Sequence, residues 1–173
     1  DIYIYYHTIL KPEAIKDAMD AAPEGAETVT LNYDNTATVG WNGDEYTLPT
    51  STGSQAFSTT MLDKTSSIVT AVSEIEYSII INENRVPLNG GQPLALTDTL
   101  GEGKEGFLYR DDSVRLINMD NATVLTPGSS VTDSTYTITW AKGDTKGFTI
   151  SVPDGQRLQL TYRVKPMSPI GTD

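Results

Sequence analysis

The chain has 173 residues, of which 38% are hydrophobic, enough in length and composition for at least one packed domain. Its formal net charge of −11 argues against nucleic acid and anionic membrane as partners, because both present phosphate. The sequence has no cysteine and one histidine, His7. These counts exclude disulfides and thiolate zinc sites, and they disfavour a histidine metal centre or a Ser-His-Asp triad, so no cofactor or metal is expected.

Most of the chain carries strand signals, which are short stretches rich in Val, Ile, Thr, Tyr and Leu with frequent alternation of polar and apolar residues. The predicted strands are 2–9, 27–33, 36–41, 45–48, 68–72, 75–82, 93–98, 113–118, 123–125, 135–140, 146–152 and 157–164. Turn residues separate them, as at Asn89-Gly90-Gly91 and Pro153-Asp154-Gly155. Regular short strands with turns between them predict an all-β fold, an antiparallel β-sandwich.

One segment has a helical period instead. Its apolar residues recur at helical spacing, at Ile15, Ala18, Met19 and Ala22. Pro12 suits a first helical position, and Pro23-Glu24-Gly25 suits a stop. This pattern predicts a short helix near the N-terminus that caps one end of the sandwich. Further on, the small polar residues of 49–56 predict a linker.

An internal repeat indicates how the chain is organised. Residues 1–8 and 157–164 align without a gap, and both place a tyrosine, Tyr6 or Tyr162, at the same point of the inward face. On this basis 1–50 holds the end of one module, or strands that complete the next, and 57–173 forms a β-sandwich module. The ends of this sequence would then not coincide with the boundaries of the modules.

The second part of the chain resembles the immunoglobulin-like pilin and adhesin modules of Gram-positive surface proteins, of the Cna-A or fimbrial isopeptide D2 type. The segments that carry the resemblance, in the order of that family, are Asp63-Lys64-Thr65, Glu76–Asn82, Pro93–Leu100, Ser113–Leu116, and Phe148–Gly155 followed by Leu158–Tyr162. The resemblance implies an Ig-like antiparallel β-sandwich on an extracellular, cell-wall-anchored protein. It also implies a spontaneous isopeptide bond between a lysine and an asparagine.

The chemistry of such a bond sets its own requirements. An ammonium ion cannot attack a carbonyl carbon, so the lysine must lose its proton, which burial in apolar surroundings favours. A carboxamide is a poor electrophile, so a protonated carboxylic acid must polarise it and shuttle the proton. A rigid core then holds the three groups in contact.

Lys64 is the expected amine, because it occupies the position of the family's lysine just before the predicted strand 68–72. Asp98 is the expected catalytic acid, because it ends an alternating strand in which Leu94 and Leu96 face inward. Glu76 is the alternative acid. The structural alternatives are that Lys64 is an exposed lysine beside Asp63, and that Asp98 caps the turn that follows it.

The acceptor asparagine of the family lies in a last-strand motif that Asp34–Val39 resembles, so Asn35 is the expected cross-link partner. The motif precedes Lys64 here, whereas the family has it after the acid. If 1–50 belongs to a preceding module, Asn35 lacks its lysine and acid and cannot react here. If 1–50 completes this sandwich, Asn35 and Lys64 could be bonded within the chain or between chains, the latter by covalent strand exchange. The alternative is an Asx turn at Asp34-Asn35.

Two functions follow from these residues. The first is a structural stalk or spacer module of a bacterial adhesin or pilus, without enzymatic turnover and with neighbouring modules as partners. The second is an adhesin module that binds a host protein or glycan through loops or through an aromatic surface around Trp41 and Trp140. A glycoside hydrolase would need a paired-carboxylate cleft, for which the sequence gives no signal.

Overall fold

The computed structural model of the chain describes residue 5 and residues 11–23, 26–38, 50–101, 106–141 and 147–167. Apart from Tyr5, the predicted strand 2–9 and the first copy of the repeat lie outside the described residues, as do the predicted strand 45–48, His7 and Trp41. The elements in chain order are α1 (Pro12–Asp20), β1 (Thr28–Thr38), β2 (Thr50–Thr60), β3 (Leu62–Val69), β4 (Glu74–Ile81), β5 (Leu94–Thr99), β6 (Phe107–Asn118), β7 (Val124–Pro127), β8 (Thr135–Trp140), β9 (Gly147–Val152) and β10 (Leu158–Pro166). The predicted all-β fold with one short helix near the N-terminus is confirmed.

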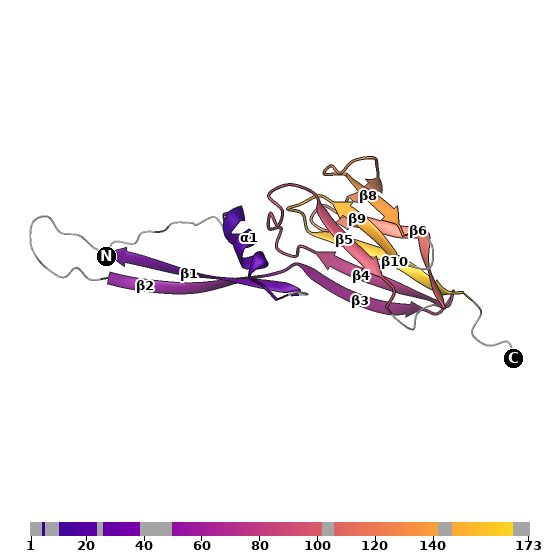
Figure 1. Cartoon of the computed structure of the whole chain (residues 1–173), viewed down its shortest axis with the longest axis horizontal. Helices are drawn as coiled ribbons and strands as arrows, with labels where there is room; N and C mark the ends of the chain where they lie inside the picture. Colours follow the sequence, from indigo (N-terminus) through magenta and orange to yellow (C-terminus); the bar gives the residue numbers. More distant parts are fainter. Residues whose placement is uncertain are drawn as a thin grey trace, which may run out of the picture.

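The helix α1 lies where a hairpin meets the main sheet (Figure 1). Its Ile15 is fully buried and belongs to a small apolar cluster that is separate from the main core. The other buried members of this cluster are Val29, Leu31, Val86 and Leu88. The helix thus packs on β1 and on the loop between β4 and β5. It is neither long enough nor apolar enough to cross a membrane, and no other helix occurs among the described residues.

The strands β1 and β2 form a two-stranded antiparallel hairpin, from the pair Thr28 and Thr60 to the pair Thr38 and Thr50. The prediction of a linker at 49–56 is therefore wrong from Thr50 onward. Small polar residues resemble a linker by composition, but threonine also favours extended backbone, and cross-strand hydroxyl pairs stabilise it. One such pair joins Thr30 Oγ1 and Ser58 Oγ at 2.8 Å. Figure 1 shows the hairpin directed away from the rest of the fold, with β2 running on into β3.

The remaining strands form one strongly curled sheet in the order β3-β4-β10-β6-β7-β8-β9-β5. β3, β4, β10 and β6 make one layer, and β8, β9 and β5 make the facing layer. The short β7 joins them, antiparallel to β6 and parallel to β8. The two strands at the ends of this order, β3 and β5, belong to opposite layers, and their approach is where the candidate site lies.

The core lies between the two layers, and strand alternation creates it. The buried inward residues of β10 are Leu158, Leu160, Tyr162 and Val164, and those of β9 are Phe148, Ile150 and Val152. Burial of a large side chain of this kind contributes about 1.5–3 kcal/mol. Trp140 also packs against this core, in ring contact with Phe148 at 5.2 Å between centroids.

A turn between β9 and β10 fixes the loop that leads into β5. The carboxylate of Asp154 accepts the backbone N–H groups of Leu88, Asn89 and Gly91, each at 2.9 Å. Gly155 follows with φ of 70°, a left-handed conformation that glycine adopts without strain. The start of β5 is thereby tied to the turn before β10, which limits how far β5 can move from the opposite layer.

Candidate cross-linking site

Lys64 lies inside β3, because the strand begins at Leu62 and not at the predicted residue 68. It pairs across the sheet with Ile79, a buried residue of β4, so its side chain leaves the strand on the inward side. The Lys64 Nζ atom lies 4.8 Å from the ring centroid of Tyr77 and 5.8 Å from that of Tyr162. The side chain is 40% exposed, so the core covers the amine on one side only.

Asp98 lies in β5, opposite Phe148 of β9, and its side chain is 8% exposed. Its orientation agrees with the inward face predicted from Leu94 and Leu96, and it does not cap a turn. One carboxylate oxygen accepts a hydrogen bond from Lys64 Nζ, and the other accepts one from the Tyr109 hydroxyl at 2.6 Å. The structure therefore brings the expected amine and the expected acid into direct contact, across the two end strands of the sheet.

Aromatic rings surround this pair. Tyr77 and Tyr162 stack at 5.3 Å between centroids, and Tyr109 lies 5.7 Å from Tyr162. Tyr162 is 1% exposed, and its hydroxyl lies near the Asp98 carboxyl without a hydrogen bond of ordinary geometry. Sequence reasoning placed Tyr162 on the inward face but did not assign these tyrosines to the site. Alternation could have suggested Tyr77 and Tyr162, whereas 107–110 lay outside any predicted strand and gave no signal for Tyr109.

Burial, followed by the neighbouring Asp98 carboxyl, raises the pKa of both Tyr109 and Tyr162 far above the ordinary value of a tyrosine. Both hydroxyls therefore stay protonated in the folded chain at all ordinary pH values. Tyr109 acts as a permanent donor to Asp98, and it holds the carboxyl in a fixed orientation toward Lys64.

These raised pKa values predict a loss of stability in alkali. The unfolded chain releases the two protons above about pH 10, where the folded chain retains them, so the free energy of unfolding falls as pH rises beyond that value. Urea unfolding at neutral and at alkaline pH measures the change, and Tyr109→Phe should reduce its size. Ionisation of every tyrosine near pH 10 in a chain that remains folded, followed by phenolate absorbance, would contradict this result.

A groove of about 410 Å³ runs over the Lys64–Asp98 pair. It is lined by Ala26, Glu27, Leu62, Lys64, Ile79, Leu96, Thr97, Asp98 and Thr99. Most of these residues come from β3 and β5, so the groove follows the gap between the two end strands. Its walls are mixed: Leu62, Ile79 and Leu96 supply apolar surface beside the charged pair, and Glu27, Thr97 and Thr99 supply polar surface.

Asn35 is not brought to this site within the chain. It lies in β1 opposite Gly53, which precedes Lys64 by eleven positions along β2 and β3 (53 to 64). At about 3.3 Å per strand residue this separation is roughly 35 Å, and the hairpin points away from the sheet (Figure 1). The Asp34 carboxylate accepts a hydrogen bond from Ser54 across the hairpin at 2.6 Å, and Asp34 and Asn35 lie within the continuous strand β1 and not in the alternative Asx turn.

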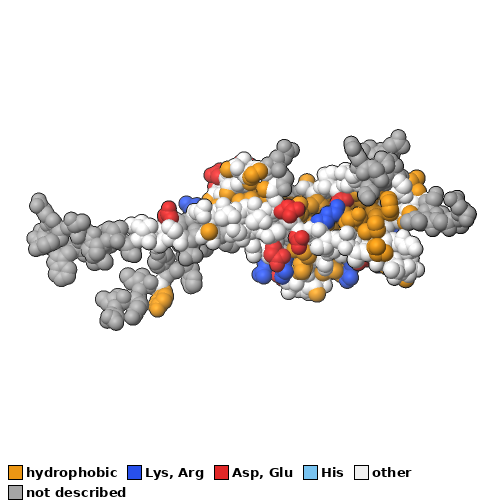
Figure 2. Space-filling view, turned by 90° about the horizontal axis from the view of Figure 1, so that it is seen from below, with side chains coloured by type: hydrophobic (Ala, Val, Ile, Leu, Met, Phe, Trp, Pro, Cys, Tyr) orange, Lys and Arg blue, Asp and Glu red, His pale blue; other side chains and the backbone are white. Residues whose placement is uncertain are grey.

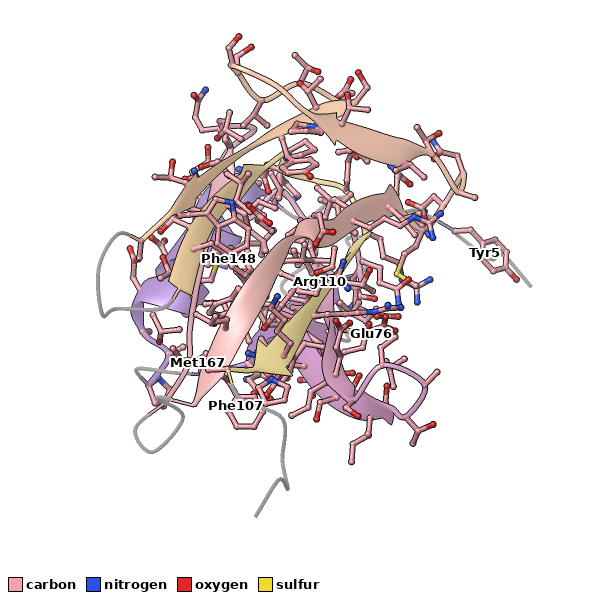
Figure 3. All side chains as sticks on the ribbon, turned by 90° about the vertical axis from the view of Figure 1, so that its right-hand side faces the viewer. Tyr5, Glu76, Phe107, Arg110, Phe148 and Met167 are labelled. Atoms are coloured by element: carbon pink, nitrogen blue, oxygen red, sulfur yellow. The ribbon has the colours of Figure 1, made fainter. Side chains whose placement is uncertain are left out.

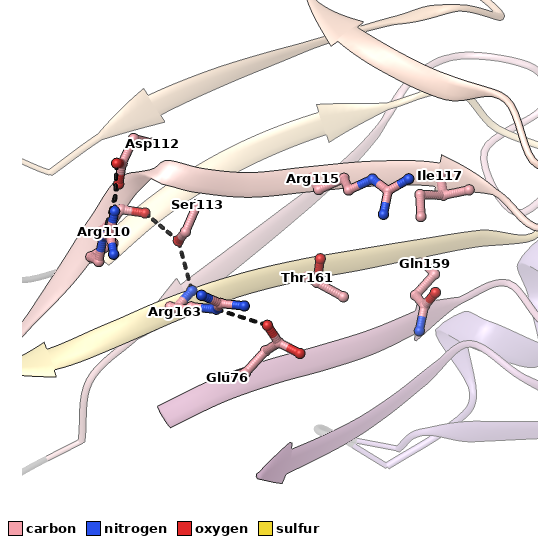
Figure 4. Close-up of a pocket in the computed structure, with 9 residues that line it drawn as sticks. All are labelled: Glu76, Arg110, Asp112, Ser113, Arg115, Ile117, Gln159, Thr161 and Arg163. Atoms are coloured by element: carbon pink, nitrogen blue, oxygen red, sulfur yellow. Dashed lines mark hydrogen bonds and ion pairs between the residues drawn. The ribbon is translucent and has the colours of Figure 1, made fainter. Parts of the chain in front are cut away.

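Glu76, the alternative acid, lies on the opposite side of the layer from Lys64. Its carboxylate accepts a hydrogen bond from Arg163 Nε at 2.8 Å in a polar pocket on the outer face (Figure 4). Figure 3 shows Phe148 and Glu76 on opposite sides of the β6 and β10 ribbons. The geometry therefore favours Asp98. No group of three or more His, Asp or Glu side chains is arranged to hold a metal ion within the described part of the chain.

Comparisons with known proteins add a distant likeness. No family model and no curated protein matches the sequence. Among solved structures, the chain is similar to the crystal structure of the group B streptococcus pilus 2b backbone protein, with 17% identity and a TM-score of 0.44. The similarity covers 64% of this chain and 47% of that one, so it spans about half of the pilus protein's length. At this low identity and TM-score the likeness assigns neither a family nor a function.

Proposed function

We propose that this chain is a structural module of a bacterial cell-surface stalk or pilus, extracellular and anchored to a Gram-positive cell wall. In this module Lys64 forms an isopeptide bond with an asparagine side chain, and Asp98 acts as the acid. The observation that carries the proposal is the contact of Lys64 with Asp98 across the two end strands of the sheet. The Ig-like family resemblance of residues 57–173 supports the same reading.

The contact suits each step of the reaction. Asp98 takes a proton from the Lys64 ammonium, and the neutral Nζ attacks the carboxamide carbon of the asparagine. The protonated Asp98 donates a hydrogen bond to the carboxamide oxygen and then passes the proton to the leaving nitrogen. A new C–N bond forms, the former C–N bond of the amide breaks, and ammonia leaves. Asp98 also takes the second proton, which Nζ loses on becoming an amide nitrogen, and passes it to the departing ammonia, so that ammonium forms and Asp98 ends as a carboxylate.

The product would give the module mechanical strength. β3 is the first strand of the sheet and lies at its end, so force on the chain would peel it away strand by strand. A covalent bond from Lys64 to an asparagine on a strand packed beside it would prevent β3 from separating under force. Such a reaction happens once for each chain, so the module is not an enzyme in the sense of turnover.

A synthetic peptide of the β1 sequence, Thr28–Thr38, tests the reactivity of the site. We expect an adduct with the chain whose mass is the sum of the two, less one ammonia, and a digest that places the bond at Lys64. The Lys64→Arg chain and a peptide carrying Asn35→Ala are the matched controls and should give no adduct. Absence of the adduct with the wild-type pair, or a bond at another lysine, would overturn the proposed function.

A further inference from the structure

The two end strands of the curled sheet each leave one edge without a strand among the described residues. β3 pairs only with β4, and β5 pairs only with β9. An open strand edge presents unpaired N–H and C=O groups, which favour the addition of another strand. The groove over Lys64 and Asp98 lies between these two edges, so a strand that entered it could pair with one of them, as the free edge of a hairpin can.

The inner face farther along β3 from this groove also lacks cover. Ile68 of β3 pairs with Ile75 and therefore lies on the same side of the sheet as Lys64, yet it is 73% exposed. Figure 2 shows hydrophobic side chains gathered on the underside of the sandwich, toward the end away from the hairpin. An apolar side chain on the inward face of an edge strand normally packs against a facing layer. Its exposure indicates that a further strand belongs there.

The buried Tyr162 hydroxyl belongs to the same small cluster as the amine and the acid. It lies near the Asp98 carboxyl but makes no hydrogen bond of ordinary geometry to it or to any other described residue, although buried polar groups are nearly always paired. Its ring lies 5.8 Å from Lys64 Nζ. A carboxamide oxygen placed against Lys64 would give this donor a second acceptor.

The β1–β2 hairpin has the features of the strand that is missing. It is a two-stranded ribbon, which is marginally stable alone, and the buried β1 residues in its packing cluster with α1 are Val29 and Leu31. Beyond that point Asp34, Asn35 and Thr36 are exposed. β1 has eleven residues, enough to run the length of the eight-residue β3. The hairpin cannot place Asn35 in the groove of its own chain, because Asn35 lies opposite Gly53, far along the hairpin from Lys64.

We infer that the groove between β3 and β5 receives the β1–β2 hairpin of a second copy of this chain, which places Asn35 of that copy against Lys64, Asp98 and Tyr162. This inference rests on the proposed function for its covalent step. The contact joins two different surfaces, a hairpin and a groove, and each copy carries both. Such a heterologous contact links the copies head to tail, and it gives an open chain when the rotation from one copy to the next does not close a ring, with one isopeptide bond at each junction.

A mixture of two full-length variants tests the inference. The Lys64→Ala chain keeps its hairpin asparagine but has no amine, and the Asn35→Ala chain keeps its amine but has no acceptor. Neither variant alone should form a covalent product. The mixture should give a single 1:1 product that survives denaturation, with a mass short of the sum by one ammonia and a digest fragment that links Asn35 to Lys64. The wild-type chain should instead give a ladder of oligomers.

The Asn32→Ala chain is the matched control. Asn32 is an exposed residue of β1 three positions before Asn35, so it alternates to the opposite face of the strand and should leave the ladder intact. If the mixed variants remain monomeric while the β1 peptide still forms its adduct at Lys64, the inference is overturned and the proposed function stands. If neither product forms, both are overturned.

Discussion

Replacing Asp98 by asparagine should slow formation of the adduct between the chain and the β1 peptide by about 10²–10⁴-fold, the usual contribution of general acid–base catalysis. The amide keeps the shape of the side chain and can still accept the hydrogen bond from Tyr109. It cannot take a proton from Lys64 or pass one to the leaving nitrogen. The yield of ammonia-deficient product over time, measured by intact mass, gives the rate.

Asp63→Asn is the control for the loss of a nearby carboxylate. Asp63 is exposed and pairs with Ile80 on the other side of β3, so its removal changes the charge near Lys64 without touching the site. We expect the rate of the Asp63 variant to stay close to that of the wild type. An Asp98→Asn chain that reacts at the wild-type rate would show that Asp98 is a structural partner of Lys64 and not the acid.

Phe148→Ala should lower the free energy of unfolding by about 3–5 kcal/mol, because it removes a large buried ring and leaves a cavity between the layers. Phe148 is 2% exposed and makes edge-to-face contacts with Tyr109 at 5.6 Å and with Tyr162 at 5.1 Å. It also pairs with Asp98 across the sheet. The substitution should therefore loosen the site as well as the core. Denaturant unfolding measures the loss of stability.

Two variants calibrate that measurement. Phe148→Leu keeps most of the apolar volume and should cost clearly less than the alanine variant. Val124→Ala changes a side chain that is 44% exposed on β7 and should stay within about 0.5 kcal/mol of the wild type. A Phe148→Ala chain as stable as the Val124 variant would contradict the assignment of Phe148 to the core.

Local patterns predicted the elements in which one face is buried. The alternation through Leu158, Leu160 and Tyr162 predicted both β10 and its inward face, and that through Leu94 and Leu96 placed Asp98 inward. These predictions succeeded because side chains of a strand alternate between faces, and a buried face must be apolar. The helix at 12–20 succeeded for the same reason, with a period of 3.6.

Composition failed where no face is strongly apolar. The Thr- and Ser-rich segment 50–60 is a strand because β1 pairs with it, and only the paired partner distinguishes it from a linker. The first half of β6 was missed because its charged residues, among them Arg110 and Asp112, interrupt the alternation. These two residues form an ion pair on the outer face, with Nη2 to Oδ2 at 2.6 Å. The pair accommodates both charges in the strand, although they give the sequence no alternating pattern.

The sequence by itself determined that this chain is a β-sandwich and which lysine, acid and asparagine to consider, because face alternation and motif order are local properties of the chain. Only the tertiary structure decided that Lys64 meets Asp98 and that Asn35 of the same copy does not. Those outcomes depend on how strands 34 residues apart curl toward one another, and on the direction in which the hairpin leaves the sheet. Long-range strand pairing of this kind has no signature in any short stretch of sequence.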